Sequence, residues 1–333
     1  MKFEVVASLD HELPCFTTAI RKDEKEISVG RKDGTVAVYK LEDATLSLSN
    51  ILEAPSTGLP MPVMDIKYLP PSADNALGNI AICADASGFI RAWHTSSAQI
   101  LHSVQSRSKE PAFTCMDVSE TQIVASGYDH LLHVYDLETF KPQQTLGMTT
   151  AELGAMSEEG IISHTNRVFS CLFHPTERNI VLSGGWDRTV MVWDTRQQNP
   201  VSHLSGPYIA GDAMSFDASG DKLYTASYDP HTGLECWDFR NLTSAWRSSG
   251  DQETHLYSCK ASNHGYVVCC GSQPNQTLVV EETNGKVIGR APFEHALFDI
   301  KLLRDDSHFI VTGDQTLSLV SLSTTAATTS SAQ

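Results

Sequence analysis

One short pattern of strand-forming residues recurs seven times along the chain. Its copies begin at Phe16, Met64, Phe113, Phe169, Asp212, Tyr257 and Phe298. The starts are 48, 49, 56, 43, 45 and 41 residues apart. Each copy is followed by a turn rich in Gly, Asp, Asn, Ser or Pro, then by a second apolar run, a tight turn and a third run, and usually by a fourth. Repetition at this period restricts the chain to a fold built from equivalent units.

Four short strands in about 40–45 residues are typical of one blade of a β-propeller. The sequence therefore predicts an all-β fold, a seven-bladed β-propeller made of four-stranded antiparallel blades. The last unit lacks an outer strand, and an unpaired sheet edge invites mispairing. We predict that residues 2–9, which lie outside the seven units, supply this strand and close the ring. Residues 1–322 are predicted to form one domain, and residues 323–333, rich in Ser, Thr and Ala, a disordered tail.

The fourth unit contains a loop histidine, a Ser-Gly-Gly-Trp-Asp turn and a third strand that ends in Trp-Asp. In these features it resembles the repeats of WD-repeat proteins. Weaker versions of the same pattern extend the resemblance over about residues 3 to 322. In WD-repeat proteins the His, Ser, Asp and Trp of one repeat form a buried, hydrogen-bonded set. The resemblance assigns these structural roles to His164, Ser183, Asp187 and Trp193.

Parts of this set recur in other units, which favours an architectural role over a Ser–His–Asp catalytic site. The recurring residues are Ser126, Asp129 and Tyr135 in the third unit, Thr225, Asp229 and Trp237 in the fifth, and the candidate histidines His255 and His295 in the sixth and seventh. Ser87 takes the Asp position in the second unit, whereas Val280 and Val320 lie near the Trp position in the last two. Nucleotide-binding loops, serine-hydrolase elbows and zinc-protease motifs are absent from the sequence. We therefore predict no enzyme activity, no catalytic residue and no cofactor.

Three successive units place an aromatic residue immediately before the turn Asp. These residues are Tyr128, Trp186 and Tyr228, and they are predicted to lie on one rim of the disc. Exposed Tyr and Trp side chains are typical of protein-binding hot spots. The alternative is that each ring packs on the neighbouring blade. An acidic insertion, Thr149 to Gly160, is predicted to emerge on the same face.

The fourth and fifth units both end in a Trp-Asp-x-Arg motif, which contains Arg196 and Arg240 respectively. Such paired motifs resemble those of substrate receptors that dock on the damaged-DNA-binding adaptor of cullin-4 ubiquitin ligases. The resemblance implies that these arginines bind the adaptor. The alternative is that each arginine caps its own turn.

Charge and cysteine content narrow the classes of partner. The chain carries 24 basic and 40 acidic residues, a net charge of −16, which disfavours binding to nucleic acid. Its eight cysteines match no zinc spacing, so we expect them to be buried and no metal to be bound. Neither a membrane-spanning run nor a signal-peptide core is present, which predicts a cytoplasmic protein, with cytoskeletal and nuclear locations as alternatives.

The leading hypothesis is a non-enzymatic scaffold that binds other proteins within a larger complex. The alternatives are a cullin-4 substrate receptor and a structural subunit of a cytoskeletal or ciliary assembly.

Overall fold

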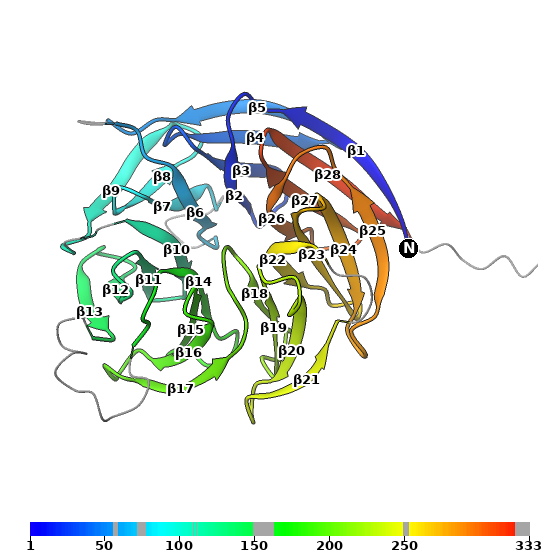
Figure 1. Ribbon diagram of the computed structural model, residues 1–333. Helices are drawn as coiled ribbons and strands as arrows, with labels where there is room; N and C mark the ends of the chain where they lie inside the picture. The colour runs from blue at the N-terminus through cyan, green and yellow to red at the C-terminus, as the bar shows by residue number, and fades with distance from the viewer. Residues whose placement is uncertain are drawn as a thin grey trace, which may run out of the picture.

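The computed structural model describes residues 1–55, 59–71, 78–108, 110, 112–148, 163–248 and 253–323. The regular structure of these residues consists of 28 strands, which form seven antiparallel sheets of four strands each. Figure 1 shows the seven sheets arranged radially around a central axis. The predicted seven-bladed propeller is therefore confirmed.

Within each blade the strands follow one another from the axis outward, except at the point of closure. The innermost strands are β2 (Cys15–Ile20), β6 (Val63–Tyr68), β10 (Phe113–Val118), β14 (Val168–Phe173), β18 (Met214–Phe216), β22 (His255–Ala261) and β26 (Leu297–Leu302). The second strands are β3 (Glu26–Arg31), β7 (Ile80–Asp85), β11 (Gln122–Gly127), β15 (Ile180–Gly185), β19 (Lys222–Ala226), β23 (Tyr266–Ser272) and β27 (His308–Gly313). The third strands are β4 (Val36–Glu42), β8 (Phe89–His94), β12 (Leu132–Asp136), β16 (Thr189–Asp194), β20 (Leu234–Asp238), β24 (Gln276–Glu281) and β28 (Thr316–Ser323). The outer strands are β5 (Thr45–Leu52), β9 (Gln99–Gln105), β13 (Pro142–Leu146), β17 (Pro200–Ser205), β21 (Thr243–Arg247), β25 (Val287–Pro292) and, from the other end of the chain, β1 (Lys2–Asp10).

The second strand of each blade is covered on both faces by the neighbouring blades. Its sequence is therefore a nearly continuous apolar or small-residue run, as in β15 and β23, and almost every residue is buried. The outer strands have only one neighbour in the blade and alternate exposed with partly buried residues, as in β9. This difference in covering explains why the inner strands are the easiest to recognise in the sequence.

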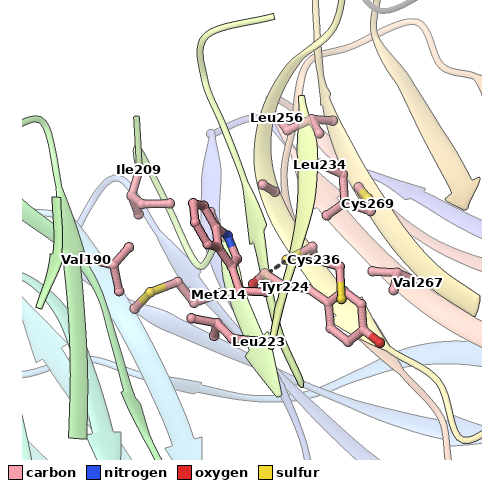
Figure 2. Close-up of a cluster of buried hydrophobic side chains, with 14 of the residues drawn as sticks. Val190, Ile209, Met214, Leu223, Tyr224, Leu234, Cys236, Leu256, Val267 and Cys269 are labelled. Carbon is pink, nitrogen blue, oxygen red and sulfur yellow. Dashed lines mark hydrogen bonds between the residues drawn. The ribbon is translucent and has the colours of Figure 1, made fainter. Parts of the chain in front are cut away.

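The hydrophobic core lies between the blades. Figure 2 shows this for blade five, whose Met214 and Leu223 face Val190 of blade four. On the other side of the same blade, Cys236 packs toward Val267 of blade six. Each blade thus buries both of its faces only when its two neighbours are present, and stability depends on an unbroken ring.

The N-terminal strand closes this ring, as predicted. β1 pairs antiparallel with β28, from Lys2 opposite Ser323 to Asp10 opposite Thr316. Figure 1 shows the two strands side by side, although they come from opposite ends of the chain. β28 includes Ser323, the first residue of the predicted tail, and the other ten residues of that segment lie outside the described residues.

One inner strand begins later than its repeat predicts. The fifth copy was expected to start at Asp212, but β18 starts at Met214. Here the Ala213 N–H donates to Gly211 O at 2.7 Å, so the chain turns before it enters the sheet. The turn leaves the Asp212 carboxylate free to meet lysines from other blades, as described below.

Candidate functional site

The structure brings together the four structural residues of blade four. The Trp193 indole N–H donates to Ser183 Oγ at 2.8 Å, and Ser183 Oγ lies 2.6 Å from His164 Nε2. His164 Nδ1 lies 2.8 Å from Asp187 Oδ2. A neutral histidine protonated on Nδ1 satisfies every member, because it then accepts from Ser183 and donates to Asp187. Burial raises the pKa of Asp187, but hydrogen bonds from His164 and two backbone N–H groups outweigh it, so this pKa is below its usual value.

The same chain of hydrogen bonds is present only in part elsewhere. In blade five the Trp237 indole N–H donates to Thr225 Oγ1 at 2.9 Å, as the repeat predicts. In blade three the predicted Ser126 is one position out of register: Ala125 lies opposite Met116, as Ser183 lies opposite Cys171. Ser126 therefore points the other way and donates to Leu131 O at 2.7 Å.

The candidate histidines of the last two blades do not occupy the His164 position either. His164 lies four residues before the start of its inner strand, whereas His255 is the first residue of β22 and its Nδ1 lies 2.6 Å from Tyr228 O. His295 lies two residues before β26. The sequence contained a better match in blade one: His11 lies four residues before β2 and its Nε2 contacts the Tyr39 hydroxyl at 3.4 Å. His11 is found in the sequence by counting four residues back from the start of the inner strand, whereas a search for any nearby histidine misses it.

Two of the three predicted rim residues, Trp186 and Tyr228, belong to a longer row of aromatic side chains. Successive ring centroids lie 4.8 to 6.1 Å apart, within the range of favourable ring contacts. We call this row the aromatic belt; its members in order are Phe169, Trp186, Tyr208, Tyr228, Tyr257, Phe298 and Phe16. Tyr128 joins it through Arg167, whose guanidinium carbon lies 3.9 Å from the Tyr128 ring centre and 5.6 Å from that of Trp186.

All rings of the aromatic belt are half-buried, so each packs on a neighbour and also keeps part of its surface open. The belt spans blades four, five, six, seven and one, at the end of the disc where the inner strands begin. The Trp186 indole nitrogen is buried and has no hydrogen-bond partner within the described structure. The packing that was the alternative for Tyr128, Trp186 and Tyr228 is thus present, and it holds the rings in fixed positions around the mouth of the central channel.

Arg196 and Arg240 lie at the other end of the disc. Their turns follow the third strands, whereas the rim aromatics precede them, and a strand separates the two ends. Each arginine pairs with the Asp two residues earlier: Arg196 Nη2 lies 2.5 Å from Asp194 Oδ2 and Arg240 Nη2 lies 3.2 Å from Asp238 Oδ2. The hydrogen bond from Arg196 holds the pKa of Asp194 at about 2. Both arginines cap their own turns, and both side chains remain about two-thirds exposed.

The central channel contains a network of buried charges that the sequence did not reveal. The inner strands and the turn before β18 contribute the carboxylates of Asp65, Asp117, Asp212 and Asp299 and the ammonium groups of Lys67, Lys260 and Lys301. Asp212 Oδ2 accepts from Lys260 at 2.8 Å and from Lys301 at 2.5 Å. These contacts join blades five, six and seven. One available signal is the Asp-Ile-Lys triplet that recurs in the second and seventh copies of the repeat.

The same carboxylates also connect neighbouring inner strands through the backbone. Asp65 accepts from the Met116 N–H at 2.9 Å, and Asp299 accepts from the Thr18 N–H at 2.8 Å. Burial is the largest influence on Asp65 and outweighs the opposing charge of Lys67, so the pKa of this carboxyl is raised to about 6. Lys301 keeps a raised pKa despite burial, because Asp212 and Asp299 face it.

A cavity of about 220 Å³ lies over this network, inside the aromatic belt. Its walls include Phe16, Met64, Phe169, Tyr257 and Phe298, and its polar lining includes Asp65, Asp212, Asp299, Thr17, Thr114 and Ser170. Ser170 Oγ is buried and has no hydrogen-bond partner within the described residues. The cavity thus combines aromatic walls with a carboxylate-rich floor.

The remaining predictions concern cysteines, metals, membranes and the insertion. All eight cysteines are buried free thiols, as predicted. Over the described ranges, no three His, Cys, Asp or Glu side chains form a group that could hold a metal ion. Within those same ranges, the chain forms no helix with the length and apolar character that a bilayer crossing requires. The acidic insertion, Thr149 to Gly160, lies outside the described residues.

Comparison with known proteins gives a family match for the best-preserved repeat. The family model described as "WD domain, G-beta repeat" matches residues 158–194, which include the structural set of blade four.

Curated relatives match over parts of the chain. A guanine nucleotide-binding protein subunit beta-like protein of Encephalitozoon cuniculi is 26% identical over 133 residues, which are 40% of this chain and 36% of that protein. Coronin-2A of Bos taurus is 30% identical over 116 residues, 33% of this chain and 21% of its own length. Ribosome biogenesis protein YTM1 of Eremothecium gossypii is 27% identical over 153 residues, 42% of this chain and 30% of its own length. The matches therefore cover about a third or less of these relatives.

Proposed function

We propose that this chain, a WD-repeat propeller, is a non-enzymatic scaffold that binds other proteins through the aromatic belt. The proposal treats residues 1–322 as one propeller domain. The single observation that carries it is the row of half-buried rings around the channel mouth, because partly exposed aromatic side chains in fixed positions supply contact area at low entropic cost.

The hydrogen-bonded structural residues of blade four support a non-enzymatic role for the chain. In blade four the His164, Ser183 and Asp187 side chains are bonded to one another or to Trp193, and His164 and Ser183 are fully buried. A nucleophile in this position could not meet a substrate without unfolding the blade. The residues that a hydrolase would use therefore stabilise the propeller, and the belt is the part left open for contacts.

The net negative charge of the chain favours a partner protein with a basic surface. The net charge of −16 attracts positively charged protein surfaces and repels nucleic acid at long range. The relatives include a coronin and a ribosome biogenesis protein. For this chain we propose a role in a larger complex, in the cytoplasm or in a cytoskeletal or nuclear assembly.

A pair of double variants tests which end of the disc binds partners. We expect Trp186→Ala with Tyr228→Ala to reduce the amount of co-purified partners at least fivefold in cells of the source organism, because both belt positions lose their rings. Arg196→Glu with Arg240→Glu is the matched control at the opposite end and should leave those partners in place. Thermal melting of both variants checks the fold. Partners retained by the Trp186–Tyr228 variant would contradict the proposal.

The cullin-4 substrate receptor is the second candidate, favoured by the exposure of both motif arginines. It predicts the reverse result, in which the Arg196–Arg240 variant loses a ligase adaptor and the belt variant keeps it. The capping bonds to Asp194 and Asp238 give both arginines a structural role without a partner, so we rank this function below the scaffold.

A further inference from the structure

We propose that the cavity inside the aromatic belt binds one cationic side chain, an arginine or a lysine, from a basic segment of the partner protein. This inference rests on the proposed function and names the chemistry that the belt recognises.

The cavity has the size of a single side chain. Its volume of about 220 Å³ is below the roughly 300–1,000 Å³ that is usual for small-molecule sites. It lies at the axis, where no blade can supply a folded element to fill it. A side chain that projects from a peptide laid across the belt can reach it.

The charged residues that line the two ends of the channel differ. Asp65, Asp212 and Asp299 line the cavity inside the belt, and no lysine or arginine does. Lys67, Lys260 and Lys301 line the cavity at the opposite mouth, together with Asp117, Asp212 and Asp217. Carboxylates are therefore the only charged groups that line the cavity inside the belt, although the lysines of the network pair with them.

The charged groups of the described inner strands and of Asp212 do not balance one another, and a bound cation would neutralise them. Four carboxylates (Asp65, Asp117, Asp212 and Asp299) oppose three ammonium groups (Lys67, Lys260 and Lys301), so the network carries one net negative charge when all are ionised. Two of the lysines approach Asp212, whereas Lys67 lies 3.3 Å from Asp65. The pKa of Asp65 near 6 agrees with a carboxylate that its neighbours compensate only in part.

The aromatic walls of the cavity favour a cation, as does its carboxylate-lined floor. Phe16 and Phe298 are stacked with centroids 5.7 Å apart, and Tyr257 meets Phe298 edge-on at 5.5 Å. A guanidinium or ammonium group over such faces gains about 0.5–2 kcal/mol from the ring quadrupole. The structure already uses this contact nearby, where Arg167 lies over Tyr128.

A buried hydroxyl without a partner points to a polar ligand. Ser170 is 1% exposed, lines the cavity and makes no hydrogen bond within the described structure. A buried hydroxyl left in this state costs about 1–3 kcal/mol. A guanidinium or ammonium N–H donated to Ser170 Oγ would remove this cost, whereas an aliphatic side chain would not.

Fluorescence anisotropy with the full chain tests the proposal. The probes are labelled nine-residue peptides of Gly, Ser and Thr with Arg, Lys, citrulline or Leu at the centre. We expect the Arg or the Lys peptide to bind at least tenfold more tightly than the citrulline and Leu peptides, because citrulline keeps the shape of arginine without its charge. Equal binding of the Leu peptide, or no binding of any peptide, would overturn the proposal.

Variants locate the binding within the cavity. Asp65→Asn keeps an acceptor for the Met116 N–H but removes the charge that faces Lys67, so thermal melting of this variant is measured beside its binding. Ser170→Ala breaks no hydrogen bond of the described structure and should fold normally. We expect Asp65→Asn to weaken the basic peptide about tenfold and Ser170→Ala about threefold. Asp194→Asn, at the opposite end of the disc, is the matched control and should leave the affinity for the basic peptide unchanged. Binding that is unaffected by Asp65→Asn would show that the peptide responds only to the acidic surface, and would contradict the proposal.

The two proposals can fail separately. If the Trp186–Tyr228 variant loses its cellular partners while no basic peptide binds, the scaffold function stands and the cationic pocket does not. If neither experiment shows an effect, both proposals are wrong.

Discussion

Removal of residues 1–9 is expected to destabilise the whole propeller. β1 is the fourth strand of the blade that contains β26, β27 and β28, and it pairs with β28 over nearly its full length. Phe3 and Leu9 of β1 also pack against the buried clusters that join this blade to its two neighbours. Partial burial of these side chains and the lost pairing together amount to about 5 kcal/mol or more. We expect a single cooperative melting transition lowered by roughly 10 °C.

Loss of β1 also exposes the edge of β28, so the truncated chain should aggregate at concentrations at which the full chain does not. Circular dichroism melting and light scattering measure the two effects. Removal of residues 324–333, the part of the predicted tail (323–333) that follows β28, is the matched control and should leave the melting temperature unchanged. A truncated chain that lacks residues 1–9 but melts like the full chain would contradict closure of the ring by β1.

Trp193→Ala is expected to have the largest effect of any single substitution in blade four. Trp193 is fully buried between blades three and four, and removal of a buried aromatic side chain costs about 3–5 kcal/mol. The substitution also removes the donor to Ser183 Oγ. Chemical denaturation should therefore show a much lower midpoint than for the unchanged protein.

Two Trp→Phe variants separate the stability contributed by the hydrogen bond from the stability contributed by burial of the ring. Trp193→Phe keeps most of the ring but loses the N–H, and should cost about 1–3 kcal/mol. Trp93 is the matched control, because it has the same register in blade two but Cys83 in place of the serine, and its indole nitrogen has no partner within the described residues. Trp93→Phe should cost clearly less than Trp193→Phe. Equal costs would show that the hydrogen-bonded set does not stabilise the blade.

Most of the fold could be predicted because each blade repeats the same local pattern. The second strands are covered on both faces and are therefore apolar throughout, and the Trp-Asp and Gly-Trp-Asp turns fix the register of β15 and β16. The N-terminal closure followed from the absence of one strand. In the weaker repeats a residue can be assigned one position away from its true place, as happened at Ser126. Such a shift turns the side chain to the other face of the sheet.

The site was predictable only in part, because its geometry depends on distances between blades. The spacing of the repeats placed Tyr128, Trp186 and Tyr228 on one rim, but Tyr208 lies in a linker and has no repeat position. The cavity joins Asp65, Asp212 and Asp299 from three blades, and no local pattern shows that they meet. Only closure of the ring brings residues that are up to 236 positions apart in the sequence, Asp65 and Lys301, into one network.

Photo-crosslinking from the two ends of the disc tests the central claim most directly. A photoreactive amino acid is placed at position 188, beside the aromatic belt, or at position 196 at the opposite end, where Arg188 and Arg196 are both more than half exposed. The scaffold proposal predicts crosslinks to specific proteins in cells of the source organism from position 188, and their loss when Trp186 and Tyr228 are changed to Ala. Specific crosslinks from position 196 alone would contradict it.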